Sequence, residues 1–183
     1  MTIRQGRPRA RVAVFACVAA LGLVADQATK MWAQVALGDG RTIGVLPPLL
    51  SLRLVRNPGA SLGFGSSNTW MITMLAIAAS AVMLVLAWRT VSTKWSLMLG
   101  LAFSGAVGNL IDRIAYADGF LDGRVVDFLD YGWSIGNVAD IALMVAGIGI
   151  VVLIMTGEPF GVKDLADMER VSGEDAASEG GAL

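Results

Sequence analysis

The chain has 183 residues, of which 55% are hydrophobic and 16% are charged, and its mean hydropathy is +0.65. These values are too apolar for a single water-soluble domain, so we expect a membrane protein. The formal net charge is −1, which leaves no surplus of positive charge to neutralise phosphates and argues against a nucleic-acid partner.

The residue types that are missing restrict the chemistry further. The chain has no histidine and only one cysteine, Cys17. An internal disulfide and the usual structural zinc site are therefore excluded. Neither a Ser-His-Asp nor a Cys-His nucleophile can be assembled without histidine. The chemistry must come from carboxylates, amides, hydroxyls or lysine.

The first apolar segment follows a basic N-terminus, residues 1–11, which we expect in the cytoplasm. The apolar run that begins at Val12 continues in a helical pattern past Asp26 and Lys30, which predicts a membrane-spanning helix at about 12–34. Asp26 and Lys30 are four residues apart, so they share a helix face and can neutralise each other. A cleaved signal peptide is the alternative for this segment, because a basic region precedes its apolar core.

Three further segments are long and apolar enough to cross a bilayer. Residues 70–88 contain no charge and are bracketed by tryptophans, which favour the two headgroup layers. The other two spans are predicted at residues 95–113 and 137–156. An even number of spans places both termini on one side, and that side holds eight basic residues against four on the other. The excess of basic residues predicts that both termini are cytoplasmic.

Two segments between the spans, residues 38–68 and 114–136, would then be extracytoplasmic. In the first, leucines at positions 50, 52 and 54 alternate with polar residues, which predicts a half-buried strand in a small sheet on the membrane surface. We expect the second to be a loop that rests against lipid headgroups. Residues 157–183 carry seven acidic residues against two basic ones, and we predict a solvated, disordered cytoplasmic tail.

Polar residues within the spans converge on one end of the predicted bundle. An ionisable group in hydrocarbon costs roughly 2.5 to 3.5 kcal/mol, so each should be paired or face a cavity. Asn109 with Asp112, and Asn137 with Asp140, each present an amide and a carboxyl three residues apart. The adjacent Arg113 offers a charge partner for Asp112, which favours a structural role. Asp140 has no basic neighbour in the sequence, which favours a functional role.

A further carboxyl, Asp127, lies between apolar residues in the segment VVDFLDY, with Asp130 as its competitor. Two carboxyls within hydrogen-bond reach cannot both ionise cheaply, so they share a proton and supply a base and an acid near neutral pH. In aspartic peptidases the ionised carboxyl deprotonates a water that attacks an amide carbonyl, and the protonated one hydrogen-bonds the carbonyl oxygen. Spacing alone does not decide which two aspartates form such a pair.

Five blocks resemble, in order and placement, the signature blocks of lipoprotein signal peptidase, the bacterial signal peptidase II. They are DQATK at 26–30, NPGASLGFG at 57–65, GNLIDR at 108–113, VVDF at 125–128 and NVAD at 137–140. The resemblance covers residues 12–156. It implies an all-α membrane protein of four transmembrane helices with a small extracytoplasmic β-sheet cradle for the substrate. The segment 38–56 resembles this cradle.

The resemblance implies an intramembrane aspartic endopeptidase that cleaves prolipoproteins on the amino side of the diacylglyceryl-modified cysteine, in the cytoplasmic membrane. Its partners would be these substrates and membrane lipids, and it implies no metal or organic cofactor. We expect a monomer. By the family pattern Asp127 and Asp140 are the catalytic pair, Asp26 and Lys30 are a buried supporting pair, and the site-shaping or substrate-binding residues are Asn57, Gly59, Asn109, Arg113 and Asn137. We expect Asp112 to give structural support.

The position of the scissile bond beside a lipid-bearing cysteine explains a site at the membrane boundary. The acyl chains of the substrate stay in the bilayer while its peptide reaches the polar helix ends. We expect Met71 and Met74, with leucines and valines of the last two spans, to form apolar walls that hold lipid.

Three other functions compete with this prediction. A small transporter or channel could use Asp112 and Asp140 as a proton relay. The inner halves of the last three spans contain little that is polar beyond serine and threonine, which disfavours a path through the membrane. A Ser/Lys peptidase like signal peptidase I would use Lys30 as its base. A pure scaffold would not need two carboxyl-amide pairs in apolar surroundings.

Overall fold

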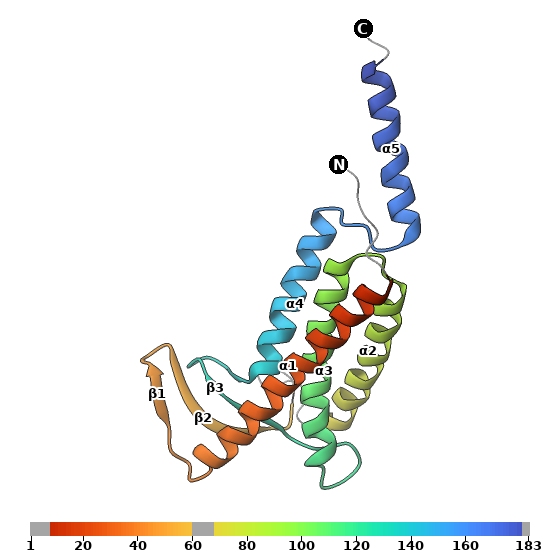
Figure 1. Cartoon of the computed structure of the whole chain (residues 1–183). Coiled ribbons are helices and arrows are strands. Elements are labelled where there is room, and N and C mark those ends of the chain that lie inside the picture. Colours follow the sequence, from red (N-terminus) through yellow and green to blue (C-terminus); the bar gives the residue numbers. More distant parts are fainter. Residues whose placement is uncertain (1–7, 60–67, 181–183) are drawn as a thin grey trace.

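The computed structural model describes residues 8–59 and 68–180 and consists of a helical bundle with a small sheet at one end (Figure 1). Four of its helices are long and apolar enough to cross a membrane. This result confirms the predicted four-helix membrane fold. The four are α1 (Pro8–Ala36), α2 (Thr69–Arg89), α3 (Thr93–Ala115) and α4 (Val138–Met155).

Helix α3 lies at the centre of the bundle, in contact with the other three helices. Half of its most apolar stretch is buried, against 6% to 22% in α1, α2 and α4. Small residues allow this close approach, as is common between helices in membranes. A Cβ built at Gly105 would lie 2.5 Å from the carbonyl oxygen of Ala139 on α4, and one at Gly108 would lie 2.5 Å from a carboxyl oxygen of Asp26 on α1.

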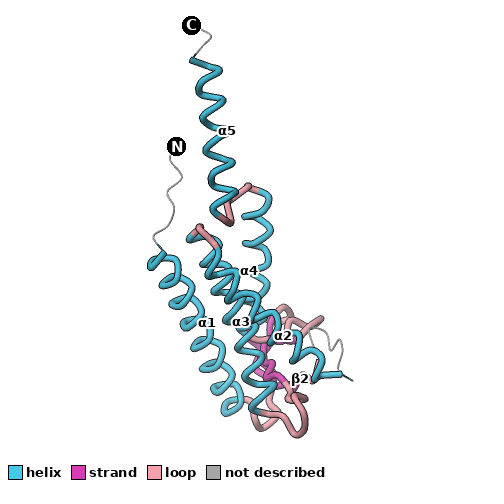
Figure 2. Tube along the Cα trace, turned by 90° about the vertical axis from the view of Figure 1, so that its right-hand side faces the viewer, coloured by secondary structure: helices cyan, strands magenta, loops and turns pink. Residues whose placement is uncertain are grey.

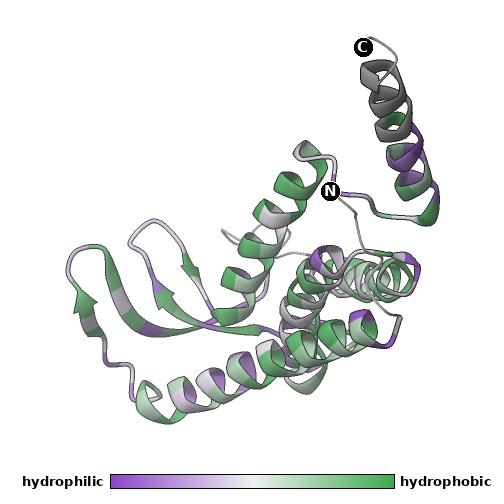
Figure 3. Cartoon of the chain, turned by 45° about the horizontal axis from the view of Figure 1, so that its top comes forward, coloured by the Kyte–Doolittle hydropathy of each residue, from purple (hydrophilic) through white to green (hydrophobic). Residues whose placement is uncertain are grey.

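Most residues along the four bundle helices are hydrophobic, as their colouring in Figure 3 shows. Large apolar side chains such as Leu21, Leu75 and Met155 are 70% to 81% exposed on three different helices. Such extensive exposure of large apolar side chains is unusual on soluble proteins and fits a surface that faces lipid.

The sheet has four antiparallel strands in the order β1-β2-β3-β4. The predicted strand around residues 50–54 is confirmed and extends further, as β2. The expectation that residues 114–136 form a loop is wrong, because β3 lies within them and pairs with β2. Its first four side chains are all buried, so it lacks the alternation that marks a half-buried strand. The strands are β1 (Ile43–Leu46), β2 (Leu50–Asn57), β3 (Val125–Asp130) and β4 (Ile135–Gly136).

The prediction of a disordered tail is also wrong, because residues Val162–Gly180 form helix α5. After Pro159 the tail contains no further proline and is rich in residues that favour helices. Asp164 accepts hydrogen bonds from the backbone N–H groups of Phe160 and Gly161 and so stabilises the start of the helix. Leu165, near the start of the helix, is buried.

Helix α5 extends away from the bundle at the end opposite the sheet (Figure 2). The start of α1 lies at this same end. The bundle therefore has a sheet end and a terminal end, and the polar residues singled out above lie at the sheet end.

Candidate active site

A buried ion cluster joins α1 to α3 at the sheet end. The Lys30 Nζ lies 2.9 Å from a carboxyl oxygen of Asp26 and 2.9 Å from one of Asp112. All three residues are at most 2% exposed. The predicted Asp26–Lys30 pair is therefore confirmed. The expectation that Arg113 neutralises Asp112 is wrong, because the partner of Asp112 is a lysine 82 positions earlier, which only the packing of two helices brings close.

The two carboxylates of the cluster also hold the backbone of neighbouring elements. Asp112 accepts a hydrogen bond from the N–H of Val126 on β3 at 3.0 Å. Asp26 accepts one from the N–H of Ala139 in the first turn of α4 at 3.0 Å. The cluster thus positions β3 and α4, the two elements that carry Asp127 and Asp140. This role for α1 supports its being a retained helix rather than a cleaved signal peptide.

Asn109 connects the ion cluster to Asp140. Its Oδ1 accepts hydrogen bonds from Lys30 Nζ at 2.9 Å and from Asn137 Nδ2 at 3.0 Å. Because both donors lie on the oxygen side of the amide, its Nδ2 points the other way and donates to Asp140 Oδ1 at 2.9 Å.

Asn137 holds both Asp127 and Asp140. It is the N-cap of α4, where its Oδ1 accepts from the Asp140 N–H and its own N–H donates to Asp140 Oδ2, each at 3.0 Å. Its Nδ2 donates to Asp127 Oδ1 at 2.6 Å. The positive end of the helix dipole lies at this first turn, which favours a carboxylate there.

Asp127 lies in the middle of the sheet, opposite Val55 of β2, and is 2% exposed. Its second oxygen accepts a hydrogen bond from Asn57 Nδ2 at 2.8 Å. Burial raises the pKa of Asp127 to about 6, the Asn57 hydrogen bond opposes this rise, and the nearby negative charge of Asp140 adds to it. A carboxyl with this pKa can gain or lose a proton near neutral pH.

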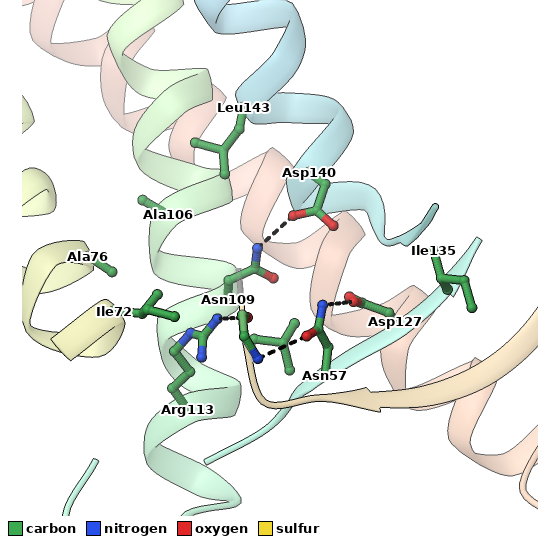
Figure 4. Close-up of a pocket in the computed structure, with 12 residues that line it drawn as sticks. Asn57, Ile72, Ala76, Ala106, Asn109, Arg113, Asp127, Ile135, Asp140 and Leu143 are labelled. Carbon is green, nitrogen blue, oxygen red and sulfur yellow. Dashed lines mark hydrogen bonds between the residues drawn. The ribbon is translucent and has the colours of Figure 1, made fainter. Parts of the chain in front are cut away.

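A cavity of about 360 Å³ opens between the helices and the sheet, and both Asp127 and Asp140 line it. Figure 4 shows Asn109 directed at Asp140 and Asn57 directed at Asp127. Asp130 does not line this cavity and pairs with Arg53 at 3.1 Å instead. The other lining residues are Asn57, Gly59, Ile72, Ala76, Ala106, Asn109, Arg113, Val125, Ile135 and Leu143.

Arg113 lies in the wall of this cavity and holds the chain after β2. Its Nη2 donates to the carbonyl oxygen of Gly59 at 2.6 Å. Its Nη1 is buried and has no hydrogen-bond partner within the described part of the chain. A buried donor without a partner is rare in folded proteins, so this group is available to a bound molecule.

A second hollow, of about 430 Å³, is also lined by Asp127. It shares Asn57, Asp127 and Ile135 with the first cavity. Its remaining walls come from the sheet and the turn after β3, and they are more polar: Arg53, Val55, Arg56, Pro58, Asp130, Gly132, Trp133 and Ser134. Asp127 therefore lines both a cavity with many apolar residues among the helices and a more polar hollow on the sheet.

Sequence reasoning missed several contributors to the site. The expected Met71 and Met74 do not line the cavity, and Ile72 and Ala76 of the same helix do. Gln27 donates to Asp26 at 3.1 Å and to the Gly108 carbonyl at 3.1 Å, and so supports the ion cluster. The i, i+4 spacing of Ile72 and Ala76 is a helix-face signal, but every residue from Trp70 to Ala79 except Thr73 is apolar, so hydropathy does not single out one face.

Within residues 8–59 and 68–180, no group of three or more acidic or cysteine side chains is placed to hold a metal ion. Neither serine nor lysine occurs among the described residues that line the first cavity. Lys30 is held in its ion cluster instead, which does not support its use as the base of a Ser/Lys peptidase. The arrangement fits carboxyl chemistry.

Residues 18–156 match the family model described as Signal peptidase (SPase) II. The chain belongs to the signal peptidase II family. This is a family of aspartic peptidases, so the protein is a membrane-embedded peptidase.

Relatives of the family share most of the chain. A lipoprotein signal peptidase of Bifidobacterium longum (strain NCC 2705) is 62% identical over 172 residues, which is 94% of each chain. One of Rhodococcus jostii (strain RHA1) is 40% identical over 149 residues, 80% of this chain and 75% of the relative. A bacterial membrane enzyme solved by the in meso method matches 79% of this chain and 89% of its own, with a TM-score of 0.70 and 26% identity.

Proposed function

We propose that this peptidase removes signal peptides from prolipoproteins by cleaving on the amino side of the diacylglyceryl-modified cysteine, with Asp127 and Asp140 as the catalytic pair. The observation that carries the proposal is that a strand and a helix bring these two carboxyls to one cavity at the boundary between the apolar bundle and the sheet. The names of the family relatives supply the class of substrate.

In this mechanism the two carboxyls share one proton. The ionised carboxyl takes a proton from a water molecule, whose oxygen attacks the carbonyl carbon of the scissile amide. The protonated carboxyl hydrogen-bonds the carbonyl oxygen as negative charge develops on it. The tetrahedral intermediate then collapses, the carbon–nitrogen bond breaks, and a carboxyl returns a proton to the leaving amine. Asn57, Asn109 and Asn137 hold the two carboxyls for these steps.

The two hollows support a division of the substrate across Asp127. The first cavity has apolar walls from α2, α3 and α4, including Ile72, Ala106 and Leu143, which suit the lipid end of the substrate. The second hollow has polar walls that suit peptide. The buried Nη1 of Arg113 offers a donor to a substrate carbonyl, and this would assign Arg113 to substrate positioning.

The proposal is tested by incubating the purified protein in detergent with a diacylated and a non-acylated precursor peptide. We expect cleavage of the diacylated peptide alone. Asp127→Asn and Asp140→Asn should each abolish cleavage while the protein still inserts. The matched control is Asp130→Asn, which lies on the same strand as Asp127 but pairs with Arg53 and should retain most turnover. Full activity in either of the first two variants would defeat the assignment.

We also propose that both termini are cytoplasmic, that the site faces the outer side of the inner membrane, and that one chain is sufficient for activity. The excess of basic residues at the terminal end supports the orientation. The chain's single cysteine makes the test direct, because Cys17→Ser leaves a background without thiols. In spheroplasts, an impermeant maleimide should label Asp39→Cys at the sheet end and not Arg89→Cys at the terminal end. The reverse pattern would invert the proposed topology.

The transporter alternative is not favoured. Asp112, one half of its supposed proton relay, is held by Lys30 and by the Val126 N–H. The buried charged groups lie together at the sheet end of the bundle rather than along its length.

A further inference from the structure

A groove lies between α1 and α2 at the terminal end of the bundle, opposite the site. It has a volume of about 560 Å³ and is lined by the first turns of α1 and the last turn of α2. Three of its lining residues, Ala13, Ala16 and Ala87, have short side chains, and so the two helices leave space between them there. We name this feature the α1–α2 groove and define it by Arg9, Arg11, Ala13, Ala16, Ala87 and Trp88.

The groove is positively charged at its mouth. Arg9 and Arg11 line it, and none of its described lining residues is acidic. Arg11 is fixed in place because its Nη1 donates to the carbonyl oxygen of Thr90, the C-cap residue of α2. A guanidinium has five N–H donors, so this bond leaves Arg11 able to bind an anion. No residue of the described chain pairs with the guanidinium of Arg9.

The rest of the groove is apolar and leads into the bilayer. Ala13 and Ala16 continue along α1 from the arginines into the membrane-spanning stretch. Trp88, which lines the groove, is 81% exposed, and exposed tryptophans of membrane proteins favour the headgroup layer. The charged mouth therefore lies where lipid phosphates lie, and the apolar floor lies where acyl chains begin.

We propose that the α1–α2 groove binds one anionic phospholipid, with its phosphate between Arg9 and Arg11 and an acyl chain along the alanines. Basic pockets between transmembrane helices are suited to anionic headgroups. A free phosphate would satisfy the arginines but would leave the apolar floor empty, so a lipid satisfies both parts. The groove lies at the opposite end of the bundle from Asp127, so this lipid is separate from the substrate.

The test measures lipid binding to the full-length protein by native mass spectrometry, with phosphatidylglycerol and phosphatidylcholine of equal chain length. We expect phosphatidylglycerol to bind more tightly. Arg9→Gln with Arg11→Gln should weaken its binding roughly thirtyfold. Ala13→Leu, which fills the floor and leaves the charge unchanged, should weaken it as well, and Ala87→Leu tests the same floor from the other helix. Cleavage of a diacylated peptide in detergent, unchanged in every variant, checks that each one is folded.

The matched control is Arg89→Gln, which removes a basic residue beside Trp88 that does not line the groove. We expect this variant to bind phosphatidylglycerol like the unmodified protein. Equal binding of the two lipids would overturn the proposal. So would a loss of binding in Arg89→Gln as large as that in the Arg9→Gln, Arg11→Gln variant, because that result would indicate a general attraction of the lipid to basic residues on the surface. Displacement of the lipid by inorganic phosphate would show that the arginines bind phosphate alone. Unchanged binding in both Ala13→Leu and Ala87→Leu would show that no acyl chain lies along the alanines. Either result would overturn the lipid assignment.

Discussion

Lys30 shows how one buried charge can organise a membrane protein. Its ammonium group lies 2.9 Å from each of two carboxylates, and each carboxylate in turn holds a backbone N–H of an element that carries a proposed catalytic aspartate. Burying three ionised groups is costly, and they are tolerated because each has several close partners. The cluster therefore links folding directly to the geometry of the site.

Removing this lysine should destabilise the protein strongly. Lys30→Met leaves two buried carboxylates without their cation, which we expect to cost about 3 to 5 kcal/mol and to lower the melting temperature in detergent. The control is Lys94→Met, which breaks the ion pair between Lys94 and Glu158. The Lys94 side chain is 70% exposed, so the loss of this pair should cost about 1 kcal/mol or less. Similar melting temperatures for the two variants would contradict a supporting role for the cluster. Asp112→Asn should lose both stability and rate.

Asp127 should make the stability of the protein depend on pH. Its pKa of about 6 in the folded state lies above its ordinary value of 3.8, mainly through burial. Between these values the folded state holds a proton that the unfolded state lacks, so stability falls as pH rises through this window, by up to about 3 kcal/mol above pH 6.

The measurement compares melting temperatures of the unmodified protein with Asp127→Asn at pH 4.5 and pH 7.5. The asparagine does not titrate, so the unmodified protein should lose stability relative to the variant as the pH rises. Alanine at position 127 cannot titrate either, so the unmodified protein should lose stability relative to Asp127→Ala in the same way as the pH rises. A difference that stays constant with pH would show that Asp127 does not titrate in this range.

At the scale of elements, the contact between α3 and α4 sets the position of Asp140. Gly105 of α3 lies against the carbonyl oxygen of Ala139, so a Cβ there would have to push α4 away. The residues on either side of Ala139 belong to the first turn of α4, where Asn137 and Asp140 form their reciprocal hydrogen bonds. A displacement of that turn would therefore reach the proposed catalytic pair.

Gly105→Ala should lower both stability and activity. We expect a loss of about 1 to 3 kcal/mol and at least about tenfold in kcat/KM, because overpacking shifts the backbone that carries Asp140. The matched control is Gly147→Ala on α4, where an added Cβ meets nothing within 4 Å. Alanine has a higher helix propensity than glycine, so this control should be neutral or stabilising by up to about 1 kcal/mol. Equal effects would show that the tight α3–α4 contact is unimportant.

At the scale of the whole molecule, the terminal end is held together by the connector between α4 and α5. Glu158 accepts hydrogen bonds from Ser92 and Lys94, each at 2.7 Å, and its carbonyl accepts one from the Trp95 ring at 3.1 Å. The ring of Phe160 packs edge-on against Trp95 at 5.2 Å. The connector thus ties the end of α4 to the turn between α2 and α3, far from the site.

Truncations should separate the connector from the tail. A chain that ends after Met168 keeps Glu158, Phe160 and the buried Leu165, and we expect its cleavage rate and melting temperature to match those of the full chain. A chain that ends after Met155 loses these contacts and should melt at a lower temperature. If both truncations behave alike, the connector does not stabilise the bundle. Thermal unfolding in detergent and the peptide cleavage assay provide the two measurements.

Local patterns were sufficient to predict the membrane fold. Uninterrupted apolar runs of membrane-spanning length predicted four helices, and alternating leucines predicted β2. These patterns are local because the side chains of one helix or strand face lipid, protein or water at regular intervals along that element. The i, i+4 spacing likewise predicted the Asp26–Lys30 pair. The family blocks singled out Asp127 and Asp140, and the structure brings both to one cavity.

Contacts between elements were decided only by the tertiary structure. The pairing of Lys30 with Asp112 and the joining of β3 to β2 connect residues far apart in the sequence, and neither has a local signature. Both Ile72 and Met71 of α2 are apolar, so hydropathy could not reveal that Ile72, rather than Met71, faces the cavity. The physical reason is that sequence periodicity reports the average environment of a residue, whereas a partner is chosen by the close packing of several elements at once.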